Sequence, residues 1–225
     1  MKYFAIIVAG GSGSRMQSKV AKQFLLLRGR PVMMYTIQAF YKCTLSPEII
    51  VVLNRHQHHY WAELCRLHHF DIPHKVVEGG ETRFHSVKNG LAHILEQGVV
   101  AIHDAVRPLV SPELILRSYK QAEKKGNCVV AVSPTDSLRK LDEAEGSLAV
   151  NRNDFILVQT PQTFIVETHK DCYNIPYEEK FTDDATVAEH CGHAIHIAEG
   201  ERENIKITYP EDLEIADIYL KKRGF

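Results

Sequence analysis

A glycine-rich segment follows the first apolar run of the chain. Ala9-Gly10-Gly11-Ser12-Gly13-Ser14-Arg15-Met16 comes directly after Tyr3–Val8. Glycines let the backbone turn tightly and point successive N–H groups at one anion. Neither common phosphate loop fits, because Met16 replaces the third glycine of the dinucleotide fingerprint and the Gly-Lys-Ser/Thr ending of the P-loop is absent. The segment predicts an anion-binding loop that ends in Arg15; the alternative is a plain strand–turn–helix connection with a solvated arginine.

Basic residues gather around this loop. The chain has 27 Lys+Arg and 28 Asp+Glu, a formal net charge of −1, which argues against a general nucleic-acid binder. The first acidic residue is nevertheless Glu48, and only basic charges precede it. They are Lys2, Arg15, Lys19, Lys22, Arg28, Arg30 and Lys42. Although some of them are expected to be surface charges, the group indicates a site for an anionic ligand.

A lone carboxylate stands in the segment His103-Asp104-Ala105-Val106-Arg107-Pro108, which follows another apolar run. Such a carboxylate near phosphates suits Mg²⁺, which takes few protein ligands and keeps its waters. The alternative is that Asp104 pairs with Arg107 and caps a turn.

Two further segments carry side chains that could contact a ligand. Glu78–Ser86 has two glycines before an expected helix start, so its backbone could approach a flat base; the alternative is a helix N-terminus capped by Thr82 or Glu81. Lys206 lies within a short apolar run and points either to solvent, which is the default, or into a polar pocket.

Several classes of protein are disfavoured. No apolar run approaches the ~18 residues of a membrane span, and no secretory leader pattern is present. The five cysteines lack C-x-x-C spacing, so we expect reduced thiols in a cytoplasmic protein. The spacing of His190, Cys191, His193 and His196 matches no zinc pattern.

The elements that must position these segments alternate between strands and helices. Strands are expected at residues 3–8, 49–53, 75–77, 99–103 and 128–132. Helices are expected at 82–96, 112–125 and after Pro210; the first would bury Val87, Leu91, Ile94 and Leu95, and the last Leu213, Ala216 and Leu220. This alternation predicts an α/β fold, a Rossmann-like, mostly parallel sheet with helices on both faces. Ligands bind at the carboxyl ends of the strands in such sheets.

The stretch Ser137–Leu157 breaks this alternation. It is polar, with an acidic centre and β-compatible flanks, and we expect a hairpin arm that projects from the main body. Such an arm buries its own apolar side chains poorly, so packing against a second subunit is expected. The alternative is a surface hairpin without a role.

The segments that carry these features also match one known family. They are Ala9–Met16, Lys22–Phe24, Gly79–Arg83, His103–Pro108, Arg152-Asn153, Gln159–Phe164, Thr182–Ala185, Glu199-Gly200, Asn204–Thr208 and Pro210–Leu213. The chain resembles the 2-C-methyl-D-erythritol 4-phosphate cytidylyltransferases nearly end to end and in order. The resemblance implies a single nucleotidyltransferase domain over residues 1–225, with the arm at about 137–157. It implies the transfer of CMP from CTP to methylerythritol phosphate, dependent on Mg²⁺ or another divalent cation. It further implies a homodimer built on the arm and acting without nucleic acid or membrane.

The resemblance also implies roles for the residues that contact CTP. The loop residues Ala9, Gly10, Gly11, Ser12, Gly13, Ser14 and Arg15 would wrap the triphosphate. Arg15 and Lys22 would stabilise the transition state, and Asp104 would help to hold Mg²⁺. The cytosine would be read by Gly80, Glu81 and Ser86.

The acceptor would lie in a second set of residues. They are Arg107, Ser137, Arg152, Thr160, Thr182 and Lys206. Arg152 and Lys206 would act in catalysis with Arg15 and Lys22, and Arg152 would reach in from the partner's arm. Ala21, where the family often has Pro, and Ser137, where it usually has Thr, depart from the family pattern without removing a needed charge or hydroxyl.

Two other functions stay open at this point. The sister family of ribitol-5-phosphate cytidylyltransferases shares several motifs, and Val106 and Gln159 favour it. Thr182–Ala185, the Glu-Asn-Ile-Lys region and the short gap between Val77 and Asp104 favour methylerythritol phosphate. A non-catalytic CTP-binding protein is a more distant alternative.

Overall fold

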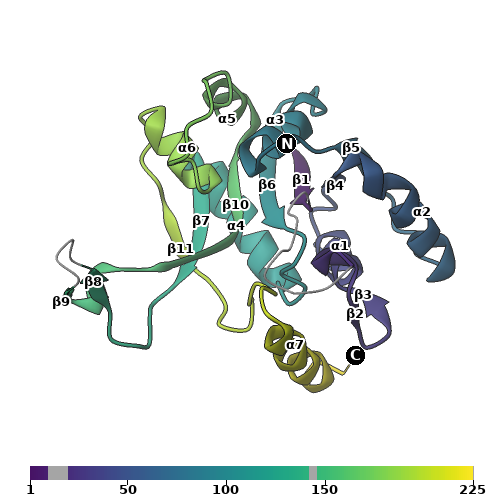
Figure 1. Cartoon of the computed structure of the whole chain (residues 1–225). Helices are drawn as coiled ribbons and strands as arrows, with labels where there is room; N and C mark the ends of the chain where they lie inside the picture. Colours follow the sequence, from purple (N-terminus) through teal and green to yellow (C-terminus); the bar gives the residue numbers. More distant parts are fainter. Residues whose placement is uncertain (10–19, 142–145, 225) are drawn as a thin grey trace.

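The computed structural model describes residues 1–9, 20–141 and 146–224. Within these residues a seven-stranded sheet has the order β11-β7-β10-β6-β1-β4-β5 (Figure 1). Its strands are β1 (Lys2–Val8), β4 (Glu48–Leu53), β5 (Lys75–Glu78), β6 (Gly98–Asp104), β7 (Asn127–Val132), β10 (Leu157–Ile165) and β11 (Ile197–Glu199). Neighbouring strands are parallel except where β10 pairs antiparallel with β6 and β7. The predicted mostly parallel sheet is therefore confirmed.

Side chains of successive strand residues enter two different cores. In β1, Ala5 and Ile7 belong to one apolar cluster, whereas Phe4 and Ile6 belong to the other. Because both faces of the sheet are covered, the central strands are continuous apolar runs rather than alternating ones. This is why their positions could be predicted from the sequence.

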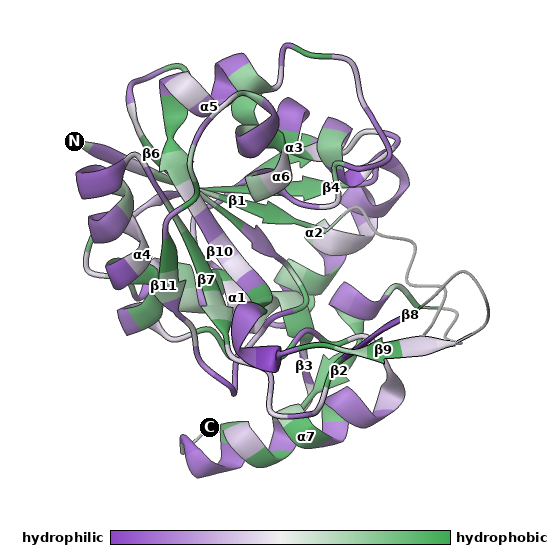
Figure 2. Ribbon diagram, turned by 90° about the vertical axis from the view of Figure 1, so that its left-hand side faces the viewer, coloured by the Kyte–Doolittle hydropathy of each residue, from purple (hydrophilic) through white to green (hydrophobic). Residues whose placement is uncertain are grey.

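Helices cover both faces of the sheet (Figures 1 and 2). On one face lie α1 (Val32–Tyr41), α2 (His58–Leu67) and α4 (Pro112–Lys125), and on the other α3 (Arg83–Ala92), α5 (Val166–Cys172) and α6 (Asp184–His190). The hydroxyl of Ser111 accepts a hydrogen bond from the Leu114 N–H, and Gly126 ends α4 with φ of 90°. These are the predicted boundaries of that helix.

A third apolar cluster lies beside α1. The last helix, α7 (Pro210–Lys222), buries Ala216 and Leu220 against Val106 and against Leu27 of β2 (Leu26–Leu27), which pairs antiparallel with β3 (Arg30–Pro31). Leu213 packs at the edge of the cluster. The predicted inward face of this helix is therefore confirmed, and α7 holds the segment that precedes it against the sheet.

The prediction of a helix over residues 82–96 was wrong at its C-terminal end. The observed α3 ends at Ala92, so Leu95 lies beyond the helix and is 89% exposed instead of facing the core. Val87, Leu91 and Ile94 are buried as expected.

The strands β8 (Arg139–Leu141) and β9 (Ser147–Ala149) form an antiparallel hairpin that projects from the body (Figure 1). The predicted arm is therefore confirmed as a hairpin, but residues from Leu157 onwards belong to the central strand β10. Leu141 is 84% and Leu148 61% exposed, so the arm leaves apolar surface uncovered in the single chain. In the described part of the chain, no helix has both the length and the apolar character needed to cross a membrane.

Candidate active site at the carboxyl ends of the strands

A cavity of about 490 Å³ opens where β1 and β6 end. It is bounded by the connection between β5 and α3 and by two lysines, Lys22 and Lys206, from opposite ends of the chain. The structure brings together here all the described residues predicted to bind the nucleotide: Ala9, Lys22, Gly80, Glu81, Ser86 and Asp104. Residues 10–19, which include the predicted Gly10–Arg15, lie outside the described residues.

Lys22 is positioned by the residues that follow it. It begins a short 3₁₀ helix, η2 (Lys22–Phe24), in which Gln23 and Phe24 are buried. The Gln23 side-chain amide donates to the carbonyl oxygen of Ala9 at 2.9 Å and to Gln57 at 3.0 Å. Because Ala9 directly follows β1, this hydrogen bond fixes Lys22 at the end of the central strand.

Gly80 and Ser86 form a tight turn at the start of α3. The Gly80 N–H donates to the Ser86 hydroxyl at 3.1 Å. A Cβ atom at position 80 would lie 2.3 Å from the Cβ of His85, so only glycine fits this close approach. Thr82 caps α3 by accepting a hydrogen bond from the His85 N–H. The helix cap that was the alternative prediction for this segment is therefore also present. Capping and pocket lining therefore occur in the same turn.

The Asp104 carboxylate lies at the end of β6 among three cations. Lys206 Nζ and Arg107 Nε lie 3.0 and 3.4 Å from Oδ2, and Arg83 Nε lies 3.8 Å from Oδ1. Burial, the largest single influence, acts to raise the pKa of Asp104, but Lys206, Arg83 and Arg107 together outweigh it and hold the pKa well below its usual range. Asp104 is therefore ionised, and the pairing with Arg107 weighed from the sequence is also present.

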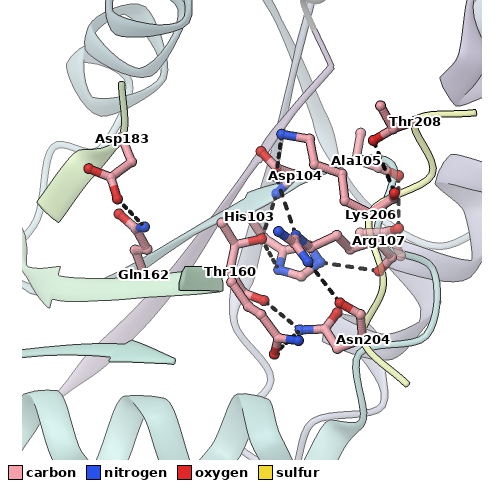
Figure 3. A network of polar contacts seen from close by, with 12 residues as sticks. His103, Asp104, Ala105, Arg107, Thr160, Gln162, Asp183, Asn204, Lys206 and Thr208 are labelled. Atoms are coloured by element: carbon pink, nitrogen blue, oxygen red, sulfur yellow. Dashed lines mark hydrogen bonds and ion pairs between the residues drawn. The ribbon is translucent and has the colours of Figure 1, made fainter. Parts of the chain in front are cut away.

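A buried asparagine sets the position of Lys206 (Figure 3). The Asn204 side-chain amide donates to the carbonyl oxygen of Thr160 at 2.8 Å, while Arg107 Nη1 donates to the carbonyl oxygen of Asn204 at 2.8 Å. Three residues after Asn204, the Ile207 N–H donates to the carbonyl oxygen of Val106 at 2.9 Å. Lys206 lies between these anchors, and its side chain points towards Asp104.

His103 is buried next to Asp104 and is neutral. Burial lowers its pKa to about 3. The Thr160 hydroxyl accepts from the Asp104 N–H at 3.1 Å and pairs with His103 Nδ1 at 3.0 Å, while His103 Nε2 lies 3.3 Å from the carbonyl oxygen of Arg107. This pattern indicates that Nδ1 accepts and Nε2–H donates. Both ring nitrogens are occupied, so His103 is not placed to act as a base.

A smaller pocket of about 140 Å³ adjoins the large cavity. Arg83, Asp104 and Lys206 line both spaces. Four of the six residues predicted to hold the acceptor line the smaller pocket: Arg107, Thr160, Thr182 and Lys206. The structure therefore places these four predicted acceptor residues beside the predicted nucleotide residues.

Ser137 and Arg152 are not among the residues that line these two spaces. Both are exposed, and Arg152 Nη1 donates to the carbonyl oxygen of Thr135 at 2.5 Å, near the base of the arm. The single chain does not bring them to its own site. This arrangement is the one expected if they serve the site of a second subunit.

The described residues fit a Mg²⁺ site only if a bound nucleotide supplies some of the ligands. Within residues 1–9, 20–141 and 146–224, no group of three or more His, Cys, Asp or Glu side chains could hold a metal ion. Asp104 supplies one ionised carboxylate in the cavity wall. Since Mg²⁺ commonly binds through one or two carboxylates with phosphate oxygens and water, one carboxylate suffices if a nucleotide supplies phosphates.

Residues 3–222 match the sequence pattern of the 2-C-methyl-D-erythritol 4-phosphate cytidylyltransferase family. The chain belongs to this family. A relative of that name from Bacteroides thetaiotaomicron is 50% identical across 98% of this chain and all of the relative. Another, from Clostridium botulinum, is 41% identical across 97% of this chain and 99% of its own.

Solved structures agree with the sequence comparison. The 4-diphosphocytidyl-2C-methyl-D-erythritol synthase of Anaerococcus prevotii is similar with a TM-score of 0.84 at 28% identity, covering 98% of this chain and 96% of its own. The 2-C-methyl-D-erythritol 4-phosphate cytidylyltransferase of Thermus thermophilus has a TM-score of 0.76 at 27% identity, covering 98% and 100%. The resemblance and the fold class predicted from the sequence are confirmed. The matched family is not the ribitol 5-phosphate family that Val106 and Gln159 favoured.

The sequence motifs contained three important residues to which no role was given. Arg83 and Asp184 form an ion pair of 2.7 Å, and Asn204 anchors the segment of Lys206. Each lies within a segment singled out from the sequence, so position along the chain was a signal. The partners of Arg83 and Asn204 are distant in sequence, which is why their contacts could not be foreseen.

Proposed function

We propose that the chain transfers CMP from CTP to 2-C-methyl-D-erythritol 4-phosphate, giving 4-diphosphocytidyl-2-C-methyl-D-erythritol and diphosphate, in non-mevalonate isoprenoid precursor biosynthesis. One observation carries this proposal: in a chain of this family, Lys22, Gly80, Ser86, Asp104 and Lys206 surround one cavity. We assign the large cavity to CTP and the smaller pocket to the acceptor. The predicted cytoplasmic location remains a prediction.

The acceptor phosphate needs no general base. The second pKa of a phosphate monoester is about 6, so the nucleophile is mostly dianionic at pH 7. This agrees with a site whose buried histidine, His103, is neutral and has both nitrogens engaged. The barrier is instead the repulsion between a dianion and a triphosphate.

The cations of the site offset this repulsion. Lys22 lines the nucleotide cavity, and Lys206 lines both spaces, so an acceptor phosphate beside Lys206 would lie next to CTP bound in the large cavity. Arg15, on the family's pattern, would add a planar fork for two phosphate oxygens. Positioning then aligns the attack opposite the leaving diphosphate. Mg²⁺, when bound through Asp104, would supply further positive charge at the phosphate oxygens.

The acceptor site is proposed to be completed by a second copy of the chain. Leu141 and Leu148 on the arm are exposed, and the run Phe155–Val158 beside the arm is about half exposed at every position. A homodimer that covers this surface would carry Arg152 and Ser137 towards the partner's acceptor pocket, where Arg152 would bind the acceptor phosphate.

The test is the release of diphosphate by the purified chain with CTP, methylerythritol phosphate and Mg²⁺. We expect turnover that stops with excess EDTA and returns with added Mg²⁺, and a higher kcat/KM for methylerythritol phosphate than for ribitol 5-phosphate. Faster turnover of ribitol 5-phosphate would overturn the assigned acceptor. CTP binding without turnover of either acceptor would contradict the proposed activity and indicate a non-catalytic CTP-binding protein.

A further inference from the structure

Arg83 lines both the nucleotide cavity and the acceptor pocket but has no assigned role. Its side chain is 26% exposed, and it stands in the first turn of α3. Nη2 of Arg83 lies 2.7 Å from Oδ2 of Asp184, a carboxylate with no exposed surface. The guanidinium is therefore tied on one side to the protein interior and borders the site on the other.

The two oxygens of Asp104 have different neighbours. Lys206 and Arg107 approach Oδ2, at 3.0 and 3.4 Å. The shortest contact of Arg83 with Asp104 is instead to Oδ1, with Nε at 3.8 Å. Cations on both oxygens restrict rotation of the carboxylate about its Cβ–Cγ bond, so Arg83 contributes to the direction in which Oδ1 points.

Arg83 is also better anchored than Lys206. Lys206 has a side chain that is 41% exposed and is proposed to bind the acceptor phosphate, which would draw it away from Asp104. Arg83 instead shares Asp184 with Tyr173, whose hydroxyl donates to Oδ1 of Asp184 at 2.7 Å. Burial, the largest single influence, acts to lower the pKa of the Arg83 guanidinium, but Asp184, Asp104 and Tyr173 together outweigh it and raise that pKa.

Ring packing strengthens the same anchor. The ring of Phe84, the residue after Arg83, stacks on Tyr173 with centroids 4.6 Å apart. Two successive residues of α3 therefore contact Tyr173, which directly follows α5, and Asp184, the first residue of α6. A shift of Tyr173 or Asp184 would be transmitted to the guanidinium of Arg83 because these contacts are close and buried.

We propose that Arg83 is a positioning residue that orients the Asp104 carboxylate, and that Asp184 and Tyr173 hold Arg83 in place for this purpose. The inference rests on the proposed function, since Asp104 acts there through metal-bound nucleotide. Groups that orient a ligand to a metal commonly change metal affinity or activity by about 10- to 100-fold when they are removed.

The competing explanation is a structural tie between α3 and α6 alone. A structural tie predicts lower stability with unchanged dependence on metal, whereas the positioning role predicts a raised Mg²⁺ requirement. Tyr173→Phe removes one buried hydroxyl that donates at 2.7 Å. Tyr119→Phe is the matched control, because the fully buried Tyr119 also donates at 2.7 Å, to the carbonyl oxygen of Phe4, and lines neither space of the site.

The experiment measures CTP binding to the full chain by titration calorimetry, without metal and over a range of Mg²⁺ concentrations. For Tyr173→Phe we expect the Mg²⁺ concentration that gives half of the metal-dependent gain in CTP affinity to rise about threefold to tenfold, with metal-free CTP affinity unchanged. Asp184→Asn should raise it further, by about 10- to 100-fold. For Arg83→Lys, this Mg²⁺ concentration should lie between the values for wild type and Asp184→Asn.

A Mg²⁺ requirement of Tyr173→Phe that equals that of Tyr119→Phe overturns the proposal, even if Asp184→Asn fails to fold. So does a wild type whose CTP binding is independent of Mg²⁺. The proposed function is judged separately, by diphosphate release from wild type with methylerythritol phosphate. Its failure would leave the calorimetric comparison as a valid test of Arg83.

Discussion

Lys206 and Asp104 form an ion pair of 3.0 Å that joins the segment before α7 to the end of β6. The pair lies on the boundary between the two spaces of the site, since both residues line each of them. Lys206 is the more exposed partner, so an anionic acceptor can compete with Asp104 for its ammonium group.

Replacing Lys206 should therefore impair the acceptor more than the nucleotide. For Lys206→Met we expect kcat/KM for methylerythritol phosphate to fall about 10²- to 10³-fold, because one charge-stabilising donor is lost. CTP affinity, measured by calorimetry, should change far less. Lys120→Met is the control, since Lys120 pairs with Glu123 on the surface and lines neither space. A Lys206→Met enzyme with near-normal acceptor kinetics would remove Lys206 from the site.

Gly80→Ala should weaken CTP binding. The added Cβ would lie 2.3 Å from the Cβ of His85 and 2.8 Å from its backbone carbonyl carbon, so the turn that pairs Gly80 with Ser86 must shift. We expect the Kd for CTP to rise about tenfold, the effect of a modest overpacking strain. In Gly192→Ala, φ is 84° and the added Cβ meets no atom of the described residues within 4 Å, so stability should fall by about 1 kcal/mol with CTP affinity unchanged. Equal CTP affinities for the two variants would contradict the assigned base pocket.

Two buried histidines should make the fold sensitive to acid. Burial lowers the pKa of His103 to about 3 and that of His169 to about 4, from an ordinary value of 6.5. Between pH 6.5 and 4 the unfolded chain binds protons that the folded chain does not, so the free energy of unfolding falls as the pH falls. The limiting slope is about 1.4 kcal/mol per pH unit for each histidine. Urea unfolding at pH 7, 6 and 5 measures this slope.

His169→Phe separates the two contributions. Among the described residues, neither ring nitrogen of His169 has a hydrogen-bond partner, and the ring stacks on Phe164 with centroids 3.8 Å apart. Phenylalanine keeps an aromatic ring there, so we expect a gain of about 1 kcal/mol at pH 7 and a shallower slope below pH 6.5. An unchanged slope would show that His169 does not titrate as described.

The proposed sharing of Arg152 between subunits has a complementation test. Arg152→Ala and Lys206→Met should each be nearly inactive as pure proteins. After random reassortment of an equal mixture, about one quarter of the sites should combine an intact Lys206 with an intact partner Arg152, if dimers are closed and symmetric. No recovery is expected if Arg152 serves its own chain. Arg139→Ala, an exposed arm residue bonded to Ser147, is the control and should retain activity.

Local patterns predicted the parallel part of the fold. Strands such as β1 and β6 are apolar on both faces, and α4 carries its start and stop signals in Ser111 and Gly126. These features depend on neighbours in sequence, so they are visible without a structure. The end of α3 was overextended because Leu95 keeps the helical spacing although the helix has ended.

The strand β10 was missed because its polar residues suggest a loop. Gln162 is buried, donating to Asp183 at 2.9 Å and accepting from the Ala185 N–H at 2.9 Å. The Thr160 hydroxyl likewise forms hydrogen bonds with the His103 ring and with the Asp104 N–H. Their partners lie on other elements, and only the folded chain brings them together. The role inferred for Arg83 could not be predicted either, because its partner Asp184 belongs to α6 and is distant in sequence.

The course of β10 links two regions of the molecule. The strand begins at Leu157, close to the hairpin, and within a few residues reaches Thr160 in the acceptor pocket. A displacement of the hairpin would therefore reach a wall of the smaller pocket, to which we assign the acceptor. Dilution that dissociates the proposed dimer should therefore first raise the KM for the acceptor, while the affinity for CTP is retained.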